Sequence, residues 1–456
     1  MHLEKVKIVA GSVRRLLRRS AHENAARLLL KLRPGDISVI MQQLNLREQL
    51  QLFTLVAQKD RQLAAEALND LGVERGVELV TDLEGLEISK ILQELETDDR
   101  AAFITALPQK LAEEVLEVMR PEDSVQTQGL LQYEEETAGR IMTPNIFSLE
   151  EQLSVGEATQ TIQESSDFEM VFYLYVVDDR NHLVGVISLR QLLTVSPSTP
   201  LAKIMSTDLI SVDTATDQEE VANQVALYDL LAIPVVDHEN KLVGVITVDD
   251  VIDVIQDEAT EDILHLAGME ADDTVHATAL NSISKRLPWL FVNLFLALMA
   301  ASVVYFYEET IGQLPILAAF LPVVAGMGGN SGTQALTVMV RSLALGEVSW
   351  KNLRGVFAKE VKVGLSNGLA LGLVAGIVGY WWSPSSDLRV GIAFGVAMLA
   401  TIFLSGVLGA IIPMSLNRLK MDPAIASGIF VHTLTDVIAF FSFLGLANFF
   451  LFSIRS

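Results

Sequence analysis

Five long apolar runs lie in the last 169 residues of this 456-residue chain and decide its class. A bilayer core of about 30 Å needs roughly 20 apolar residues as helix. Four runs of that size contain no charged residue, and a fifth is interrupted once, by Asp436. The runs are Pro288–Tyr307, Ile311–Val340, Val363–Ser386, Val390–Asn417 and Ala424–Ser453. We therefore predict a transmembrane domain of five helices over residues 288–456.

The charge of the chain divides at the same place. Residues 288–456 hold seven acids and nine bases, a net +2, so the other 50 acids and 24 bases give residues 1–287 a net charge of −26. This division excludes a single globular enzyme, and an acidic surface makes nucleic acid an unsuitable partner because polyphosphates need clustered Lys and Arg. There is no cysteine, which excludes thiolate metal sites, thiol catalysis and a disulfide scaffold.

Basic residues in the connections predict the orientation. They gather between the second and third runs and just before the first, and the N-terminus lacks the apolar stretch of a signal peptide. The basic residues are Arg341, Lys351, Arg354, Lys359, Lys362, Lys285 and Arg286. The positive-inside rule then predicts a multi-pass protein of the inner (plasma) membrane, with a cytosolic N-terminus and the C-terminus outside. Five spans contain no internal two-fold axis, which favours a pore between two copies, hence a homodimer.

The second run is unusually rich in helix breakers and polar residues. It contains Pro315, Pro322, Gly326 and the stretch 328–334, Gly-Gly-Asn-Ser-Gly-Thr-Gln. Irregular backbone at membrane depth is tolerated where it lines a water-filled cavity, so we predict an interrupted helix beside a cavity. The alternative is close helix packing through small residues.

Asp436 is the one charged residue within the five apolar runs. It follows Pro423 by thirteen positions, which is about 20 Å along a helix at 1.5 Å per residue. A charge near mid-bilayer costs about 2.5–3.5 kcal/mol on insertion scales, so we predict an ion pathway there. Gly428, His432 and Asp436 share one helix face. The alternatives are a protonated Asp436 bonded to a neighbouring helix and a His432 that only packs.

The part before the membrane contains a repeat. Val176-Val177-Asp178 and Leu183–Ser188 recur 59 positions later as Val235-Val236-Asp237 and Leu242–Thr247. Each copy predicts strand, turn, strand and then a helix capped by Ser or Thr. We place the two α/β modules at 136–203 and 204–257. Residues 1–135 predict an acidic domain of short helices in a superhelical array, and residues 258–287 a connector formed by one helix.

Acidic residues gather where these parts should meet. Asp249, Asp250, Asp253, Asp257, Glu258, Glu261 and Asp262 follow the second module, and Asp98, Asp99, Glu219 and Asp229 are further candidates. Hard divalent cations take oxygen ligands, and Mg²⁺ uses one or two carboxylates while keeping waters. Such sites would hold domains together when the ion is abundant and release them by repulsion when it is scarce. The alternative is a solvated acidic face.

Taken together, the order of parts resembles the MgtE family of magnesium channels along the whole chain, and the repeat resembles a pair of CBS modules. The most specific motifs are the runs 329–334 and 340–346, Asp422-Pro423-Ala424 with Thr435-Asp436, and the run 247–262. The resemblance implies that Asp436 binds hydrated Mg²⁺ with the backbone carbonyl of His432, and that Asn330 borders the pathway. It also implies a homodimer with the pore on its two-fold axis, closed by cytosolic Mg²⁺. The implied sensor residues are Asp98, Glu219, Asp229, Asp250, Asp253, Glu258, Glu261 and Asp262, beside Asp249.

The chain departs from the family pattern at four positions. Ala439 and Ile429 stand where Gly and Pro are frequent near the pore acid. Leu230 and Gln191 stand where family members that bind ATP have an aromatic residue and an Asp, although the candidate nucleotide residues Tyr173 and Arg190 are present. ATP binding between the modules therefore remains open.

Three functions follow from these patterns. The first is a Mg²⁺-selective channel that works passively, since no Gly-x-x-x-x-Gly-Lys-Ser/Thr run for nucleotide hydrolysis occurs. The second is a transporter of the same architecture for Co²⁺, Mn²⁺ or Ni²⁺, for which His432 is the candidate softer ligand. The third is a membrane-tethered nucleotide sensor that does not conduct, against which Asp436 argues. None of the three is an enzyme.

Overall fold

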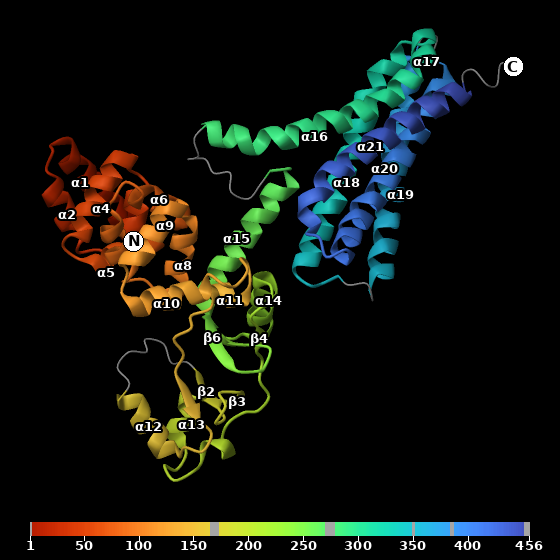
Figure 1. The fold of residues 1–456 in the computed structure, drawn as a ribbon. Coiled ribbons are helices and arrows are strands. Elements are labelled where there is room, and N and C mark those ends of the chain that lie inside the picture. The colour runs from red at the N-terminus through yellow and green to blue at the C-terminus, as the bar shows by residue number, and fades with distance from the viewer. Residues whose placement is uncertain (1, 165–172, 270–278, 349–351, 384–386, 451–456) are drawn as a thin grey trace. The chain divides into compact units, whose positions relative to one another are not determined.

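The computed structural model describes residues 2–164, 173–269, 279–348, 352–383 and 387–450 (Figure 1). The chain forms two compact units, residues 1–254 and 255–456. The first holds a helical array and a pair of α/β modules, and the second holds the apolar helices. The multidomain fold class predicted from the sequence is confirmed.

The first unit begins with an array of short helices that form a superhelix, shown in red and orange in Figure 1. Alternate helices pack on one another, as α3 does on α5 and α5 on α7, around a continuous apolar core. Asn45 caps α4 in a capping box with Glu48, and the Asp60 side chain caps α5; such caps stabilise the start of each short helix. The helices are α1 (His2–Arg18), α2 (His22–Leu29), α3 (Pro34–Met41), α4 (Leu46–Ala57), α5 (Arg61–Asn69), α6 (Val73–Val80), α7 (Gly85–Leu92), α8 (Thr97–Ala106), α9 (Gln109–Val118) and α10 (Pro121–Leu130).

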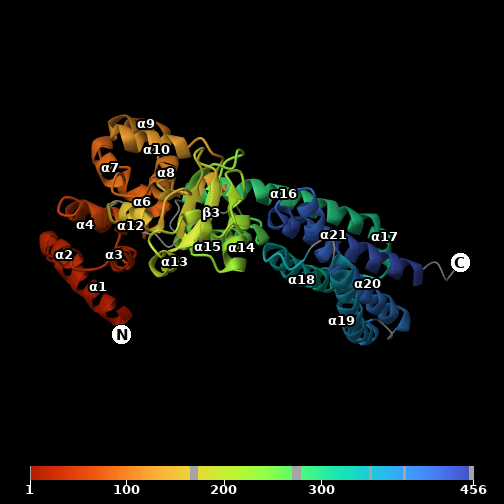
Figure 2. The ribbon, with the colours of Figure 1, turned by 90° about the horizontal axis from the view of Figure 1, so that it is seen from below.

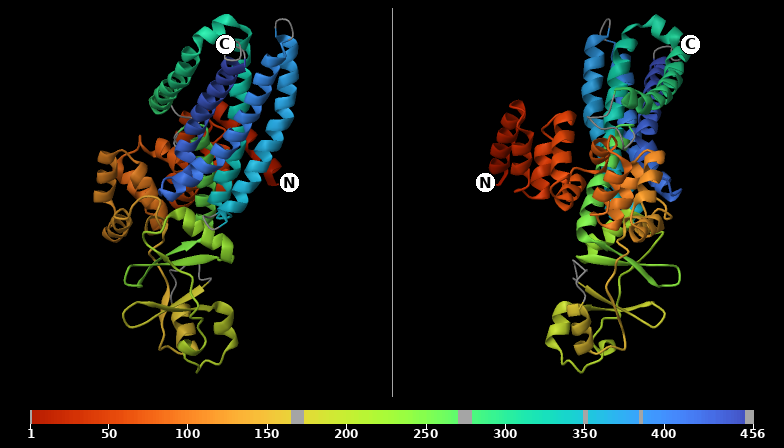
Figure 3. Two further views of the ribbon diagram at one scale, coloured as in Figure 1. Left: turned by 90° about the vertical axis from the view of Figure 1, so that its right-hand side faces the viewer. Right: turned by 60° about the vertical axis from the view of Figure 1, so that its left-hand side comes forward.

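Each of the two following modules contains a three-stranded sheet in which the first strand runs parallel to the second and the second antiparallel to the third. Figure 3 shows the two modules in succession, yellow and then green. The first module contains β1 (Ser148–Glu150), α12 (Val155–Glu164), β2 (Tyr173–Val177), β3 (Leu183–Ser188) and α13 (Leu189–Thr194). The second contains β4 (Val212–Asp213), α14 (Gln218–Tyr228), β5 (Ala232–Val236) and β6 (Leu242–Thr247). A short helix α11 (Ala138–Ile141) and a 3₁₀ turn (Leu201–Lys203) complete the pair.

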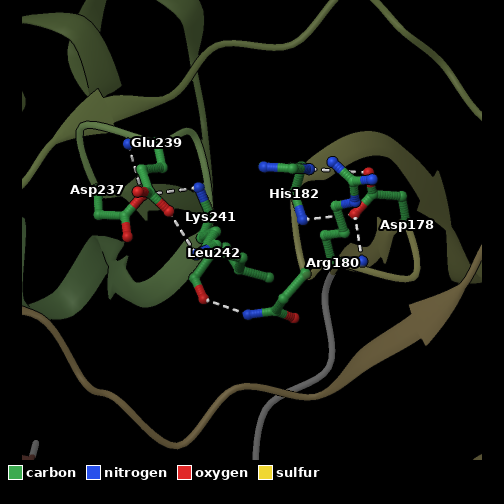
Figure 4. Close-up of polar contacts among 8 residues, drawn as sticks. Asp178, Arg180, His182, Asp237, Glu239, Lys241 and Leu242 are labelled. Carbon is green, nitrogen blue, oxygen red and sulfur yellow. Dashed lines mark hydrogen bonds and ion pairs between the residues drawn. The ribbon is translucent and has the colours of Figure 1, made fainter.

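The turns between the last two strands of each module are built alike (Figure 4). Asp178 Oδ1 accepts hydrogen bonds from two amides of its own turn, at 2.9 and 2.8 Å, and Asp237 Oδ1 does so in the other module, both at 2.9 Å. Asn181 and Asn240 occupy the left-handed region at φ 66° and 62°, which Asn tolerates. Each also reaches the other module, Asn181 Nδ2 donating to the Leu242 carbonyl at 2.9 Å. The predicted repeat is thus confirmed as two modules packed through matching turns.

The helix after the second module is shorter than predicted. Helix α15 (Val248–Leu266) does not continue to Arg286, so the prediction of one helix over 258–287 is wrong. Gly268 lies in the left-handed region at φ 72°, the amide of Met269 donates to the Leu264 carbonyl and that of Gly268 to the His265 carbonyl. This is the Schellman pattern that ends helices at glycine.

The second unit contains five helices long and apolar enough to cross a membrane, as predicted. They are α16 (Ala279–Phe306), α18 (Ile316–Ala344), α19 (Leu353–Trp382), α20 (Leu388–Arg418) and α21 (Pro423–Asn448), with a short α17 (Glu308–Gln313) between the first two. Helices α18, α20 and α21 pack together, and α19 lies against α20 along glycines on both helices (Figure 1). The chain is a multi-pass membrane protein.

Helix α18 is continuous, so the prediction of an interrupted second span is wrong. Its glycines serve close packing. A Cβ on Gly328 would lie 2.6 Å from Thr401 Cγ2 of α20, and one on Gly332 would lie 2.8 Å from Val431 Cγ1 of α21. The small residues let three helices approach one another, which is the alternative that the sequence had left open.

This packing predicts a difference between two neighbouring glycines. Gly328→Ala should destabilise the membrane domain by about 1–3 kcal/mol, the usual cost of overpacking, because the new methyl group would collide with Thr401. Gly326→Ala is the matched control, since no atom lies within 4 Å of its added Cβ. Thermal unfolding in detergent, followed by size-exclusion fluorescence, measures both; equal melting temperatures would contradict the packing role.

Candidate functional site

Carboxylates gather in the first unit where α8 and α15 begin; Asp98, Asp99 and Asp250 are half-buried and Asp249 is exposed. Asp98 and Asp99 lie in the first turn of α8, and Asp249 and Asp250 in the first turn of α15. The groups are close enough to act on one another, since Asp250 raises the pKa of Asp98, and Asp253 and Asp249 raise the pKa of Asp99. Five of the acids predicted from the sequence therefore meet here, Asp98, Asp99, Asp249, Asp250 and Asp253.

Burial dominates the electrostatics of this carboxylate cluster. Desolvation raises the pKa of Asp98 well above its usual value, and that of Asp99 to about 6. It raises the pKa of Asp250 to about 7, although the Thr247 hydroxyl donates to Asp250 Oδ2 at 2.6 Å and opposes the shift. One oxygen of Asp98, Oδ1, is buried and accepts no hydrogen bond from any described residue. Buried carboxylates in this state need a proton or a cation.

The neighbouring polar groups do not supply that cation. The charge of Asp98 acts on Arg100, but Arg100 forms its ion pair with Asp123, at 3.1 Å, and donates hydrogen bonds to the Leu92 and Leu95 carbonyls at 3.1 and 2.9 Å. Asn69 Nδ2 donates to Asp99 Oδ2 at 2.7 Å. Sequence reasoning missed two further acids of the cluster, Glu96, which raises the pKa of Asp98, and Asp70, whose own pKa is raised by desolvation, Glu66 and Asp253.

A second acidic group lies in the second unit, where the end of α15 meets the start of α21. His265 Nδ1 lies 3.1 Å from Asp422 Oδ2, and His265 Nε2 lies 3.6 Å from Glu261 Oε1. One ligand atom from each of the three residues falls within 4.8 Å of the others. Desolvation and the charge of Asp422 raise the pKa of Asp262, and His265 opposes this. Sequence reasoning placed Asp422 in a motif but gave it no role as a ligand, and it did not single out His265. The sequence pattern of Asp422 is that of an N-cap, and its Oδ1 does accept a hydrogen bond from the Ala424 amide at 2.8 Å.

The remaining sensor candidates lie on α14 and α15. Glu219 lies in the first turn of α14, and Asp229 ends the same helix in the left-handed conformation. Ten residues of helix separate them, about 15 Å, so one chain cannot place both on one ion. Glu258 lies on α15 one turn before Glu261.

Helices α18 and α21 bring the two membrane motifs together. Thr333 Oγ1 lies 3.3 Å from His432 Nε2, and a Cβ on Gly329 would lie 3.2 Å from His432 Nδ1. Asn330 and His432 are exposed, and Asp436 is half-buried one turn after His432. Sequence reasoning missed the bond from the buried Thr435 hydroxyl to the His432 carbonyl, at 2.8 Å. The polar stretch of α18 therefore lies beside the helix face of α21 that carries Asp436.

The nucleotide candidates lie in the first module. Tyr173 begins β2 and pairs with Ser188 of β3. Arg190 follows Ser188 by two residues and is exposed. Gln191 forms a capping box with Ser188 at the start of α13. Leu230 packs against the core of the second module and offers no aromatic ring.

Comparisons with known proteins match most of the chain to a family of transporters. Residues 32–136 match the MgtE intracellular N domain, residues 138–198 and 201–257 match CBS domains, and residues 321–446 match the MgtE divalent cation transporter family. The chain is 41% identical to the magnesium transporter MgtE of Enterococcus faecalis, over 72% of either chain. It is 34% identical to that of Thermus thermophilus, over 92% of this chain and 94% of the relative. A crystal structure of the cytosolic domain of the Mg²⁺ channel MgtE in complex with ATP covers 54% of this chain and 99% of that one, with 34% identity and a TM-score of 0.50.

Proposed function

Because this chain belongs to the MgtE family of divalent cation transporters, we propose that it passes Mg²⁺ through its membrane helices and that Mg²⁺ bound by its cytosolic carboxylates closes it. Two curated relatives that it matches over most of its length are magnesium transporters. The observation that supports the regulatory part of the proposal is the carboxylate cluster of α8 and α15, in which desolvation and mutual repulsion raise the pKa values of Asp98, Asp99 and Asp250.

The pathway proposed here runs along the exposed face of α21. Asp436 supplies the charge, the His432 carbonyl a further oxygen, and Asn330 of α18 borders them. Mg²⁺ holds its water strongly and needs few protein ligands, so one carboxylate and neighbouring oxygens suffice for a hydrated ion. The face is open in one chain, which supports a homodimer whose second copy supplies the other wall on a two-fold axis. Movement is then passive, driven by concentration and membrane potential.

Closure follows from the charge balance of the carboxylates. Without cation, Asp98, Asp99 and Asp250 can share their site only by taking up protons, and above their raised pKa values they repel. A divalent ion removes that repulsion and stabilises the closed arrangement. Glu258, Glu261 and Asp262 near Asp422, and Glu219 and Asp229 on α14, would bind further ions in the same way. The proposed orientation places all of them in the cytosol and the C-terminus outside, in the inner membrane.

Mg²⁺, not a nucleotide, is the proposed regulator. The solved relative binds ATP. In this chain the partly buried Leu230 packs against a module core and offers no aromatic ring, and Gln191 carries no carboxylate and forms a capping box, so only Tyr173 and Arg190 of the candidate residues remain.

Uptake into proteoliposomes tests transport. With a Mg²⁺ indicator inside the vesicles and a valinomycin-imposed negative potential, the purified protein should give Mg²⁺ entry that rises with potential. Competing Co²⁺, Mn²⁺ and Ni²⁺ test the alternative cargo, because the imidazole of His432 would favour these ions. Entry of those ions with exclusion of Mg²⁺ would overturn the proposal.

The raised pKa values predict that Mg²⁺ displaces protons. Since the pKa of Asp250 is about 7 and that of Asp99 about 6, these carboxyls are partly protonated at pH 6.5 and ionised at pH 8.5 in the cation-free arrangement. Mg²⁺ binds the ionised form, so proton release should be large at pH 6.5 and small at pH 8.5. Calorimetry in buffers of different ionisation enthalpy measures it, with Asp250→Asn reducing the release; equal release at both pH values would contradict the site.

A further inference from the structure

The first 33 residues have a charge opposite to the rest of the cytosolic part. They contain nine Lys and Arg but two Glu, a net +7. Residues 34–287 contain 48 acids and 15 bases, a net −33. Solubility alone does not require this change of sign. Like-charged Arg residues four positions apart also destabilise a helix.

The structure places the basic residues of α1 on one exposed face. A different face of α1 is buried in the helical array through Val6, Ala10, Val13 and Leu17. Lys7, Gly11, Arg14, Arg15 and Arg18 are exposed, and their spacing of three, four and seven residues puts them on one side of a helix. Helix α1 is the first of the array, and Figure 2 shows it at the outer edge of the red helices.

No carboxylate of a described residue pairs with this face. Arg14 Nη2 donates to the Gln43 carbonyl at 2.6 Å, and Arg15 to the Gly11 carbonyl and the Ser12 hydroxyl. Glu23 of α2 pairs instead with Lys59. Ile8 lies beside the basic residues with 67% of its surface exposed. The face therefore combines uncompensated positive charge with an exposed apolar side chain.

We propose that this basic face of α1, defined by Lys7, Gly11, Arg14, Arg15 and Arg18, binds the anionic head groups of the membrane that holds the chain. Lipid is the polyanion that a membrane-anchored protein always meets. Basic helix faces with an apolar residue dock on anionic leaflets by charge attraction and shallow insertion. The contact would tether the helical array to the bilayer, and it does not depend on which ion the chain conducts.

The absence of cysteine allows a single reporter in the full-length protein. Gly11 lies in the middle of the face and has no atom within 4 Å of an added Cβ, so Gly11→Cys can carry a donor fluorophore. Nanodiscs are prepared with zwitterionic lipid alone or with added phosphatidylglycerol, and both contain an acceptor-labelled lipid. We expect energy transfer to rise at least twofold in the anionic discs and to return to the zwitterionic value in about 1 M salt, where the Debye length is about 3 Å.

Matched variants decide whether this face is responsible. The triple change Lys7→Gln, Arg15→Gln, Arg18→Gln should abolish the rise, and it leaves the Arg14 bond to Gln43 in place. The control Arg47→Gln, Arg61→Gln, Lys110→Gln removes three other exposed charges and should retain it. Transfer that is equal in both lipids, or retained in the first triple variant, would overturn the proposal. So would a signal that depends on a second copy in the disc or on added oligonucleotide, because the partner would then be protein or nucleic acid.

Discussion

Asp436→Ala should reduce Mg²⁺ uptake into proteoliposomes to the level of protein-free vesicles. Asp436 carries the only charge within the five apolar runs, and the proposed pathway has no other charged ligand. At about 4 Å and an effective dielectric constant of 20, a unit charge pair attracts by about 4 kcal/mol, and a divalent ion by more. Since each 1.4 kcal/mol is a tenfold change in affinity, loss of this carboxylate should abolish measurable flux.

The variant needs a control for folding and for charge. Glu309→Ala removes an exposed acid from the connection between the first two spans and should leave uptake unchanged. Both variants should elute from size exclusion like the parent protein, because half-buried Asp436 makes no described hydrogen bond that the helix requires. Undiminished uptake by Asp436→Ala would remove it from the pathway.

Neutralising the cytosolic carboxylates should have the opposite effect on flux. The combined change Asp250→Asn, Asp253→Asn, Glu258→Gln, Glu261→Gln should leave a protein that conducts at millimolar Mg²⁺ on the proposed cytosolic face, a concentration at which we expect the parent protein to close. Without these charges Mg²⁺ has less repulsion to relieve and fewer ligands, so the ion favours the closed arrangement less strongly. Uptake measured as a function of Mg²⁺ on the cytosolic face checks this.

The matching control removes four exposed acids of the helical array, in the change Glu78→Gln, Glu87→Gln, Glu94→Gln, Glu117→Gln. It alters the net charge of the cytosolic part equally but leaves α8 and α15 intact, so closure by Mg²⁺ should persist. Normal closure in the first quadruple variant would refute the sensor. Loss of closure in both would show that bulk charge, and not the carboxylate cluster, is responsible.

The sequence reveals those features that depend on neighbouring residues. Long apolar runs marked the five spans, and two strand pairs with matching Asp turns marked the modules. The meeting of Asp98 and Asp99 with Asp249 and Asp250 is different, because about 150 residues separate α8 from α15 and no local pattern brings them together. The sequence supplied the acids as candidates, and the family resemblance added a role for Asp98 but not for Asp99. The same reason applies to Asp422. Its role as an N-cap can be predicted from neighbouring residues, but its proximity to Glu261 and His265 cannot.

Both errors in the predicted fold concern glycine. In α18, Gly328 and Gly332 looked like breaks in a helix, yet neighbouring helices fill the space that a side chain would occupy and the helix continues. In the connector, a single glycine, Gly268, adopted the left-handed conformation and ended α15. Tertiary contacts decide whether a glycine ends a helix or allows a second helix to approach closely, and these contacts cannot be identified from the sequence.

Current through excised inside-out patches tests the central claim most directly, because the bath then controls Mg²⁺ at the cytosolic face while the ion on the other side stays fixed. Raising bath Mg²⁺ from micromolar to millimolar should close the channel within a recording, and chelation should reopen it. Mg²⁺ current that is indifferent to bath Mg²⁺, or that grows with it, would contradict closure by the cytosolic carboxylates.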